Sequence, residues 1–82
     1  LLALLAQVDD RESCVIVIGH NPGLHELALR LARHGDDEAR ARLRAGFPTA
    51  ALAVLELDIQ RWDEIRDGCG TLIELRAPRD LV

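Results

Sequence analysis

The run Cys14-Val15-Ile16-Val17-Ile18 decides the fold class of this 82-residue chain. It is continuously apolar and rich in β-branched residues, which is typical of a parallel strand covered on both faces. Such a strand needs further strands beside it and helices on both sides of the sheet. The rest of the chain offers only about two strong helices and two more strands. We therefore expect an α/β sheet sandwiched by helices, with its early strands outside this sequence.

Helical patterns flank this run. From Leu1 to Val8, apolar residues recur at the spacing of one helix face. After the run, Asn21 suits the N-cap of a second helix, and Pro22 suits its first position, where the missing N–H would be unpaired anyway. This helix should stop at Gly35, a residue suited to the left-handed position after a helix. Its apolar face consists of Leu24, Leu27, Ala28 and Leu31.

The second half of the sequence predicts one more helix and two strands. The range Asp36 to Arg44 begins with acids and ends with arginines, which matches the helix dipole. Apolar and polar residues alternate toward the end of the range Thr49 to Gln60, and again from Thr71 to Ala77. Because the turn-rich stretch Asp67 to Gly70 lies between them, we expect these two strands to pair antiparallel.

Composition excludes several classes of function. The net charge is −4 and only one Trp and one Phe are aromatic, so the chain lacks the basic, stacking surface that nucleic acid needs. No apolar run approaches the roughly 20 residues of a membrane span, and the first residues show no signal-peptide pattern. Cys14 and Cys69 fit free thiols in a reducing compartment better than a disulfide, although a bridge between them is the alternative. We therefore expect a cytoplasmic protein with neither a nucleic-acid nor a membrane partner.

The stretch from Gly19 to Gly23, with the sequence GHNPG, carries the candidate chemistry. It places His20 at the carboxyl end of the expected parallel strand, where open α/β sheets bind ligands. The helix start behind it favours an anion such as phosphate, through free N–H groups and the positive end of the helix dipole. An imidazolium there could donate hydrogen bonds to charge that develops on transferring oxygens. The alternative is a loop histidine whose ring is satisfied by the backbone.

Five segments carry a resemblance to a known family. They are VIVIGHNPGLHELALRLA, FPTAALAVLELD, Trp62-Asp63-Glu64-Ile65, Gly68-Cys69-Gly70-Thr71-Leu72 and Ala77-Pro78-Arg79-Asp80-Leu81. Together and in this order, they resemble the C-terminal half of the SixA-type phosphohistidine phosphatases of the histidine phosphatase (phosphoglycerate-mutase-like) superfamily. The resemblance implies the C-terminal portion of a three-layer α/β/α sandwich with a mixed, mostly parallel sheet. Residues 1–82 would then form a partial histidine phosphatase domain.

The resemblance also implies a reaction. In this family a nucleophilic histidine in an early Arg-His-Gly motif takes the phosphoryl group, and water then releases it. His20 matches the second histidine of the phosphate pocket, and His20, Asn21 and Gly23 match phosphate-binding positions. The nucleophile motif and a further pocket arginine belong to the N-terminal half, so we expect the 82-residue chain alone to be inactive. The family chemistry requires no metal or other cofactor.

The parent enzyme is expected to hydrolyse phosphohistidine on a protein such as a phosphohistidine relay domain, or a related group on a small phosphorylated substrate. A non-catalytic phosphate-binding or interaction module is the alternative. Arg33-His34-Gly35 spells the nucleophile tripeptide, but it follows His20 and is expected to end a helix, so we do not assign His34 as the nucleophile. His25 fits a surface or helix-packing role, and the histidine spacings do not match a zinc site.

Overall fold

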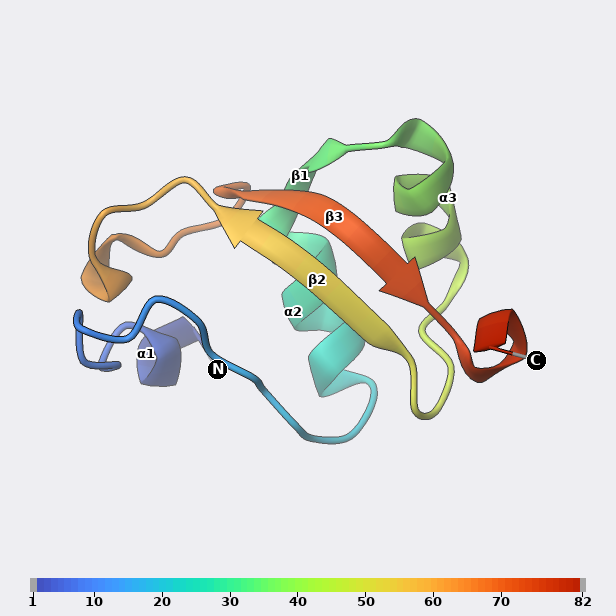
Figure 1. Cartoon of the computed structure of the whole chain (residues 1–82), viewed down its shortest axis with the longest axis horizontal. Coiled ribbons are helices and arrows are strands. Elements are labelled where there is room, and N and C mark those ends of the chain that lie inside the picture. The colour runs from blue at the N-terminus through green and yellow to red at the C-terminus, as the bar shows by residue number, and fades with distance from the viewer. Residues whose placement is uncertain (1, 82) are drawn as a thin grey trace.

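The computed structural model describes residues 2–81 of the chain, apart from the side chains of residues 79 and 81. Helices and strands both occur along this range, and three strands form a mixed sheet (Figure 1). The chain is therefore an α/β protein, as the sequence predicts. Its elements are α1 (Leu2–Leu5), α2 (Gly23–Leu31), β1 (Ala32–Gly35), α3 (Asp37–Ala45), β2 (Leu52–Leu57), the 3-10 helix η1 (Trp62–Glu64), β3 (Gly70–Arg76) and the 3-10 helix η2 (Pro78–Leu81).

The middle strand of the sheet is β3, since the strand order is β1-β3-β2. β2 pairs with β3 antiparallel, from Leu52 opposite Arg76 to Leu57 opposite Gly70, so the expected pairing of the two late strands is confirmed. β1 pairs with the other edge of β3 in parallel. The described sheet is therefore mixed but not mostly parallel, because the expected parallel strand at Cys14–Ile18 does not take part in it.

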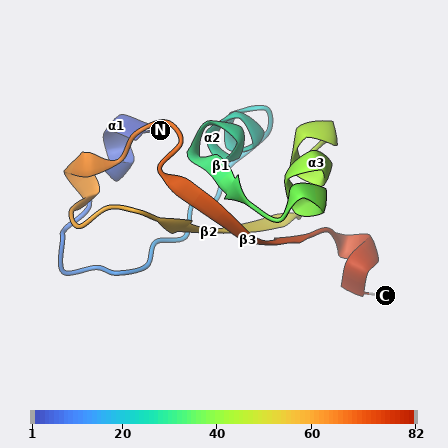
Figure 2. The ribbon, with the colours of Figure 1, turned by 90° about the horizontal axis from the view of Figure 1, so that it is seen from above.

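Helices α2 and α3 lie on one side of the sheet (Figure 2). The predicted apolar face of α2 is confirmed, because Leu27, Ala28 and Leu31 are buried. Ala28 packs in one cluster with Leu43 of α3 and Leu72 of β3, which joins both helices to the middle strand. The core of the described residues therefore lies between these helices and one face of the sheet.

The other face of the sheet exposes three large apolar side chains. Leu52 and Val54 of β2 are 53% and 37% exposed, and Ile73 of β3 is 56% exposed. Figure 2 shows no helix against this side within the described residues. Exposed apolar side chains gathered on one face of a sheet are typical of a surface that another part of a protein covers.

The segment Cys14–Ile18 is not a paired strand, which corrects the expectation from its composition. It forms no backbone hydrogen bond with any part of residues 2–81. Val15 and Val17 pack against the cluster of buried residues that also receives side chains from β2. Ile16 and Ile18 are 81% and 90% exposed. The segment is apolar on both sides, but the described chain covers only one of them.

The tripeptide Arg33-His34-Gly35 lies in a strand, and the expectation that Gly35 ends a helix is wrong. α2 stops at Leu31, and the next four residues form β1 beside β3. A Cβ atom on Gly35 would lie 2.6 Å from the carbonyl oxygen of Leu72, so this glycine permits close strand pairing. Local sequence patterns miss the pairing because Leu72 is far away along the chain.

The other helices follow the sequence closely. α3 begins where expected, because the side chain of Asp36 accepts a hydrogen bond from the Ala39 N–H at 3.0 Å. α1 is shorter than the expected range from Leu1 to Val8 and continues as turns after Leu5, while residue 1 lies outside the described residues. Within residues 2–81, no helix combines the length and apolar character needed to cross a bilayer.

Gly35→Ala should lower the free energy of unfolding by about 2 kcal/mol or more, because the new methyl group meets the Leu72 backbone and Gly35 has a φ of 128°. Gly46→Ala is the matched control, since nothing lies within 4 Å of its added Cβ. Urea unfolding followed by circular dichroism measures both variants. Equal midpoints for the two would contradict the close approach of β1 and β3.

Candidate functional site

His20 lies in the loop that joins the extended segment to α2, and its side chain is exposed. Its backbone carbonyl accepts a hydrogen bond from the Leu24 N–H at 3.3 Å, which ties the loop to the first turn of the helix. The ring makes no hydrogen bond within the described part of the chain, so the backbone does not satisfy it. His20 is therefore free to meet a ligand at this end of α2.

Asn21 has a structural partner that the sequence does not reveal. Its Nδ2 group donates a hydrogen bond to the Phe47 carbonyl oxygen at 2.5 Å, across 26 positions of the chain. The expected N-cap is wrong, because Pro22 occupies that position and no side chain caps the helix. The amide of Asn21 instead fixes the His20 loop to the loop between α3 and β2. Its Oδ1 atom and the second hydrogen of Nδ2 remain for other contacts.

The first turn of α2 offers unpaired donors. The Glu26 N–H bonds to the Pro22 carbonyl at 2.9 Å. The N–H groups of Gly23 and His25 have no acceptor within residues 2–81. Because these donors point out of the positive end of the helix dipole, a small anion next to His20 would be stabilised there.

His25 joins the two helices that cover the sheet. Its Nε2 atom lies 2.5 Å from the Leu43 carbonyl oxygen of α3. Its ring also lies against Phe47, with centroids 6.1 Å apart and a tilt of 37°. This contact fits the helix-packing role expected for His25.

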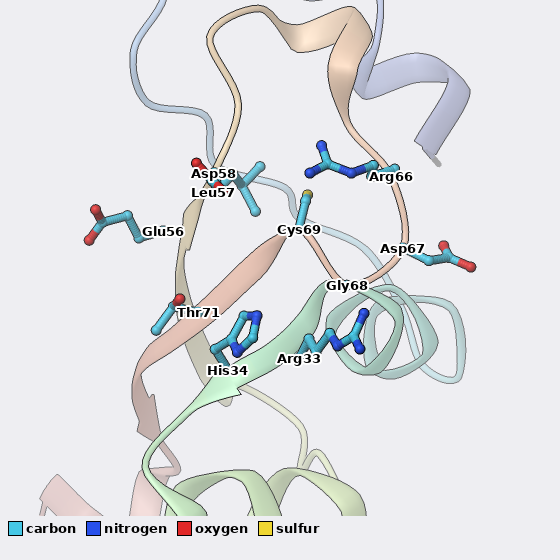
Figure 3. Close-up of a pocket in the computed structure, with 10 residues that line it drawn as sticks. All are labelled: Arg33, His34, Glu56, Leu57, Asp58, Arg66, Asp67, Gly68, Cys69 and Thr71. Carbon is cyan, nitrogen blue, oxygen red and sulfur yellow. The ribbon is translucent and has the colours of Figure 1, made fainter.

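A cavity of about 500 Å³ opens at the other end of α2 (Figure 3). A register shift in the pairing of β1 with β3 falls between Ala32 and His34, and such irregularities redirect side chains. Arg33 and His34, although consecutive, therefore both line this cavity. The residues that line it are Arg33, His34, Glu56, Leu57, Asp58, Arg66, Asp67, Gly68, Cys69 and Thr71.

Charges of both signs surround this cavity, so its lining does not select one class of ligand. Asp67 is held by Arg30, with the Nε and Nη2 atoms each 2.9 Å from Oδ1. Arg33 and Arg66 form no ion pair within the described part of the chain. Among residues 2–81, no group of three or more His, Cys, Asp or Glu side chains is placed to hold a metal ion.

The loop beside the cavity is held by η1. The Trp62 indole donates to the Glu12 carbonyl at 2.8 Å, and its backbone N–H donates to Asp10 Oδ1 at 2.9 Å. Hydrogen bonds from the Gln60 and Arg61 N–H groups to the carboxylate of Glu64 hold the pKa of Glu64 below its ordinary value. Trp62 thus anchors the loop to the N-terminal segment.

The structure does not bring His20 and His34 together. His20 precedes α2 and His34 follows it, and this helix has nine residues. At 1.5 Å per residue, the helix alone separates its two ends by about 13 Å. The two histidines therefore belong to different sites within this chain.

Comparisons with known proteins identify relatives without a described activity. No family model matches the chain, and no solved structure matches it. The chain is 36% identical over 75 residues to two uncharacterized proteins of Mycobacterium tuberculosis, recorded for two strains. Each match covers 89% of this chain and 47% of the relative. The chain thus spans about half the length of the curated relatives it matches.

Asn21→Ala should lower the free energy of unfolding by about 1 kcal/mol, because the hydrogen bond to the Phe47 carbonyl is lost. The matched control is Gln7→Ala, which removes an exposed amide side chain that makes no hydrogen bond within the described chain. Urea unfolding midpoints compare the two variants. If Asn21→Ala is no less stable than Gln7→Ala, Asn21 does not fix this loop.

Glu64→Gln should destabilise the chain at neutral pH and have little effect in acid. Folding lowers the pKa of the Glu64 carboxyl, so its charged form stabilises the folded state at pH values above the pKa of the unfolded chain, about 4.3 for glutamate. This stabilisation is lost as the pH falls through the lower pKa of the folded state. The difference in thermal midpoint between wild type and Glu64→Gln should therefore shrink from pH 7 to pH 3. A difference that stays the same from pH 7 to pH 3 would contradict the stabilising role of the hydrogen bonds to Glu64.

Proposed function

We propose that this chain is the C-terminal part of a phosphatase of the histidine phosphatase superfamily, and that His20 is the second histidine of its phosphate pocket. The parent enzyme would hydrolyse phosphohistidine or a related phosphorylated group, in the cytoplasm. The observation that carries the proposal is the GHNPG sequence at the start of α2, with the His20 side chain exposed there. The other four segments of the resemblance follow it in order.

The local geometry supports binding of a phosphoryl group at His20. The unpaired N–H groups of Gly23 and His25 would donate to its oxygens, and the helix dipole favours its negative charge. A protonated His20 ring would add a charged donor as negative charge develops on the transferring oxygens. Asn21 would act by holding the His20 loop against the Phe47 carbonyl, since its Nδ2 group already has this partner.

The proposed reaction has two steps and needs a second histidine. An imidazole nitrogen of that histidine attacks phosphorus, and the bond from phosphorus to the substrate's leaving group breaks. Water then attacks the phosphohistidine intermediate, which releases inorganic phosphate and restores the ring. His34 does not suit this role in this chain, because α2 separates it from His20. We assign the nucleophile to polypeptide outside residues 1–82.

Two further observations support a larger parent fold. The relatives are about twice as long as the matched stretch, which leaves room for a nucleophile-bearing half. The apolar sheet face and the unpaired Cys14–Ile18 segment would be covered in a three-layer α/β/α sandwich. A protein or small molecule that carries a phosphoryl group would be the partner, and no metal or cofactor is invoked.

The 82-residue chain alone should not hydrolyse an aryl phosphate such as p-nitrophenyl phosphate above the buffer rate, because it supplies only His20 of the proposed pair. Release of p-nitrophenol measures this directly. Turnover that is lost in His34→Ala but kept in His20→Ala would overturn the proposed role of both histidines.

The coding sequence ahead of Leu1 should encode a strand followed by Arg-His-Gly. In the protein that includes it, His20→Ala should lower kcat by about 100-fold or more, and His34→Ala should leave kcat unchanged. A stop codon and a genuine start near Leu1 would instead favour the non-catalytic anion-binding module.

A further inference from the structure

Positively charged side chains gather in one part of the cavity at the end of α2. Figure 3 shows the side chains of Arg33 and Arg66 on either side of the turn that contains Gly68, with the His34 ring next to Arg33. The cavity of about 500 Å³ is large enough for a small-molecule ligand. We call Arg33, His34 and Arg66 the basic group.

The carboxylates of the lining lie outside the basic group. Asp67 already has a partner, because Arg30 Nε and Nη2 each lie 2.9 Å from its Oδ1 atom, and Figure 3 shows its carboxylate pointing away from the cavity. Glu56 and Asp58 lie on the β2 side, and the Glu56 carboxylate points outward there (Figure 3). By residue type alone this lining does not select a ligand, but the directions of its side chains favour an anion at the basic group.

Arg33 is positioned by the glycine beside it. Gly68 has a φ of 76°, and a Cβ atom there would lie 3.1 Å from Cδ of Arg33, so the missing side chain lets Arg33 cross the turn. The Gly68 N–H donates to the Arg30 carbonyl at 2.7 Å, which fixes the turn to the end of α2. The aliphatic part of Arg33 is therefore supported, while the residue stays exposed to solvent.

Arg66 is held on the other side of the turn. Its Nη1 group donates a hydrogen bond to the Glu64 carbonyl at 3.3 Å. The Glu64 carboxylate in turn accepts hydrogen bonds from the N–H groups of Gln60 and Arg61, which order this loop. Arg66 forms no ion pair within the described part of the chain, so its remaining N–H groups can meet a ligand.

We propose that the basic group binds a phosphate-type dianion, either inorganic phosphate or the phosphoryl group of a small phosphate ester. A tetrahedral dianion presents oxygens to two guanidinium groups at once, and arginine binds such oxygens through paired, charge-assisted hydrogen bonds. The His34 ring adds a further N–H donor. Helix α2 separates this site from His20, so the proposal does not depend on the proposed phosphatase reaction.

The test is titration of the isotope-labelled 82-residue chain with inorganic phosphate, followed by NMR at an ionic strength kept constant with sodium chloride. The amide signals of His34 and Gly68 should shift and saturate. The amide signals of Gly23 and His25 report separately on the proposed site at His20. Shifts confined to those two amides would overturn the site at the basic group and leave the proposed function standing. Absence of a saturable shift at Gly68 would also overturn it.

Variants show whether the two arginines hold the anion. Arg33→Met and Arg66→Met should each raise the dissociation constant for phosphate by about tenfold or more, because each removes a charged donor but keeps an unbranched side chain. Arg44→Met is the matched control, since Arg44 is an exposed arginine of α3 outside the cavity, and it should leave the dissociation constant unchanged. Equal weakening by all three variants would overturn the proposal, by assigning the effect to net charge.

Two further probes define the ligand. Phenyl phosphate that shifts the same amides at least as tightly as inorganic phosphate would assign the site to a phosphate ester, and weaker binding would assign it to free phosphate. Acetate carries a single charge and should bind at least tenfold more weakly than phosphate. Acetate binding as tight as that of phosphate would overturn the assignment to a dianion.

Discussion

The pairing of β3 along both of its edges is the constraint on which the rest of the structure depends. β2 occupies one edge antiparallel and β1 occupies the other in parallel. Because β1 directly follows α2, this pairing also sets where the helix packs, and Ala28 meets Leu72 of β3 in the core. The glycine at position 35 makes the arrangement possible, since a side chain there would strike the Leu72 backbone.

Sequence patterns predict the parts of this fold that depend on neighbouring residues. The apolar face of α2, the Asp36 cap of α3 and the antiparallel late strands all follow from local spacing or turn residues. The β1 strand does not, because its four residues carry no strand pattern and its partner lies in β3. The Cys14–Ile18 run departs from its expected structure for the opposite reason. Its composition is that of a strand covered on both faces, and the described chain has no second layer to cover it.

The candidate site also has a part that local sequence predicts and a part that only the tertiary structure shows. The position of His20 before α2 follows from the helix-start residues, and the sequence alone identifies it. The contact of Asn21 with the Phe47 carbonyl could not be predicted, because no local pattern links residues 26 positions apart. The cavity around Arg33 and His34 was also missed, since it depends on the register shift in β1. Helix α2 therefore separates a sequence-encoded candidate site at its start from a cavity at its end that only the tertiary structure shows.

The unpaired segment has a consequence for the behaviour of this polypeptide in concentrated solution. A short β-branched run with a free backbone edge and few charges is a template for cross-β assembly. Cys14–Ile18 contains no charged residue and no proline that would block such growth. We therefore expect chains that expose this run to self-associate until the run is buried. Colloidal stability would then favour keeping this run inside a larger sheet.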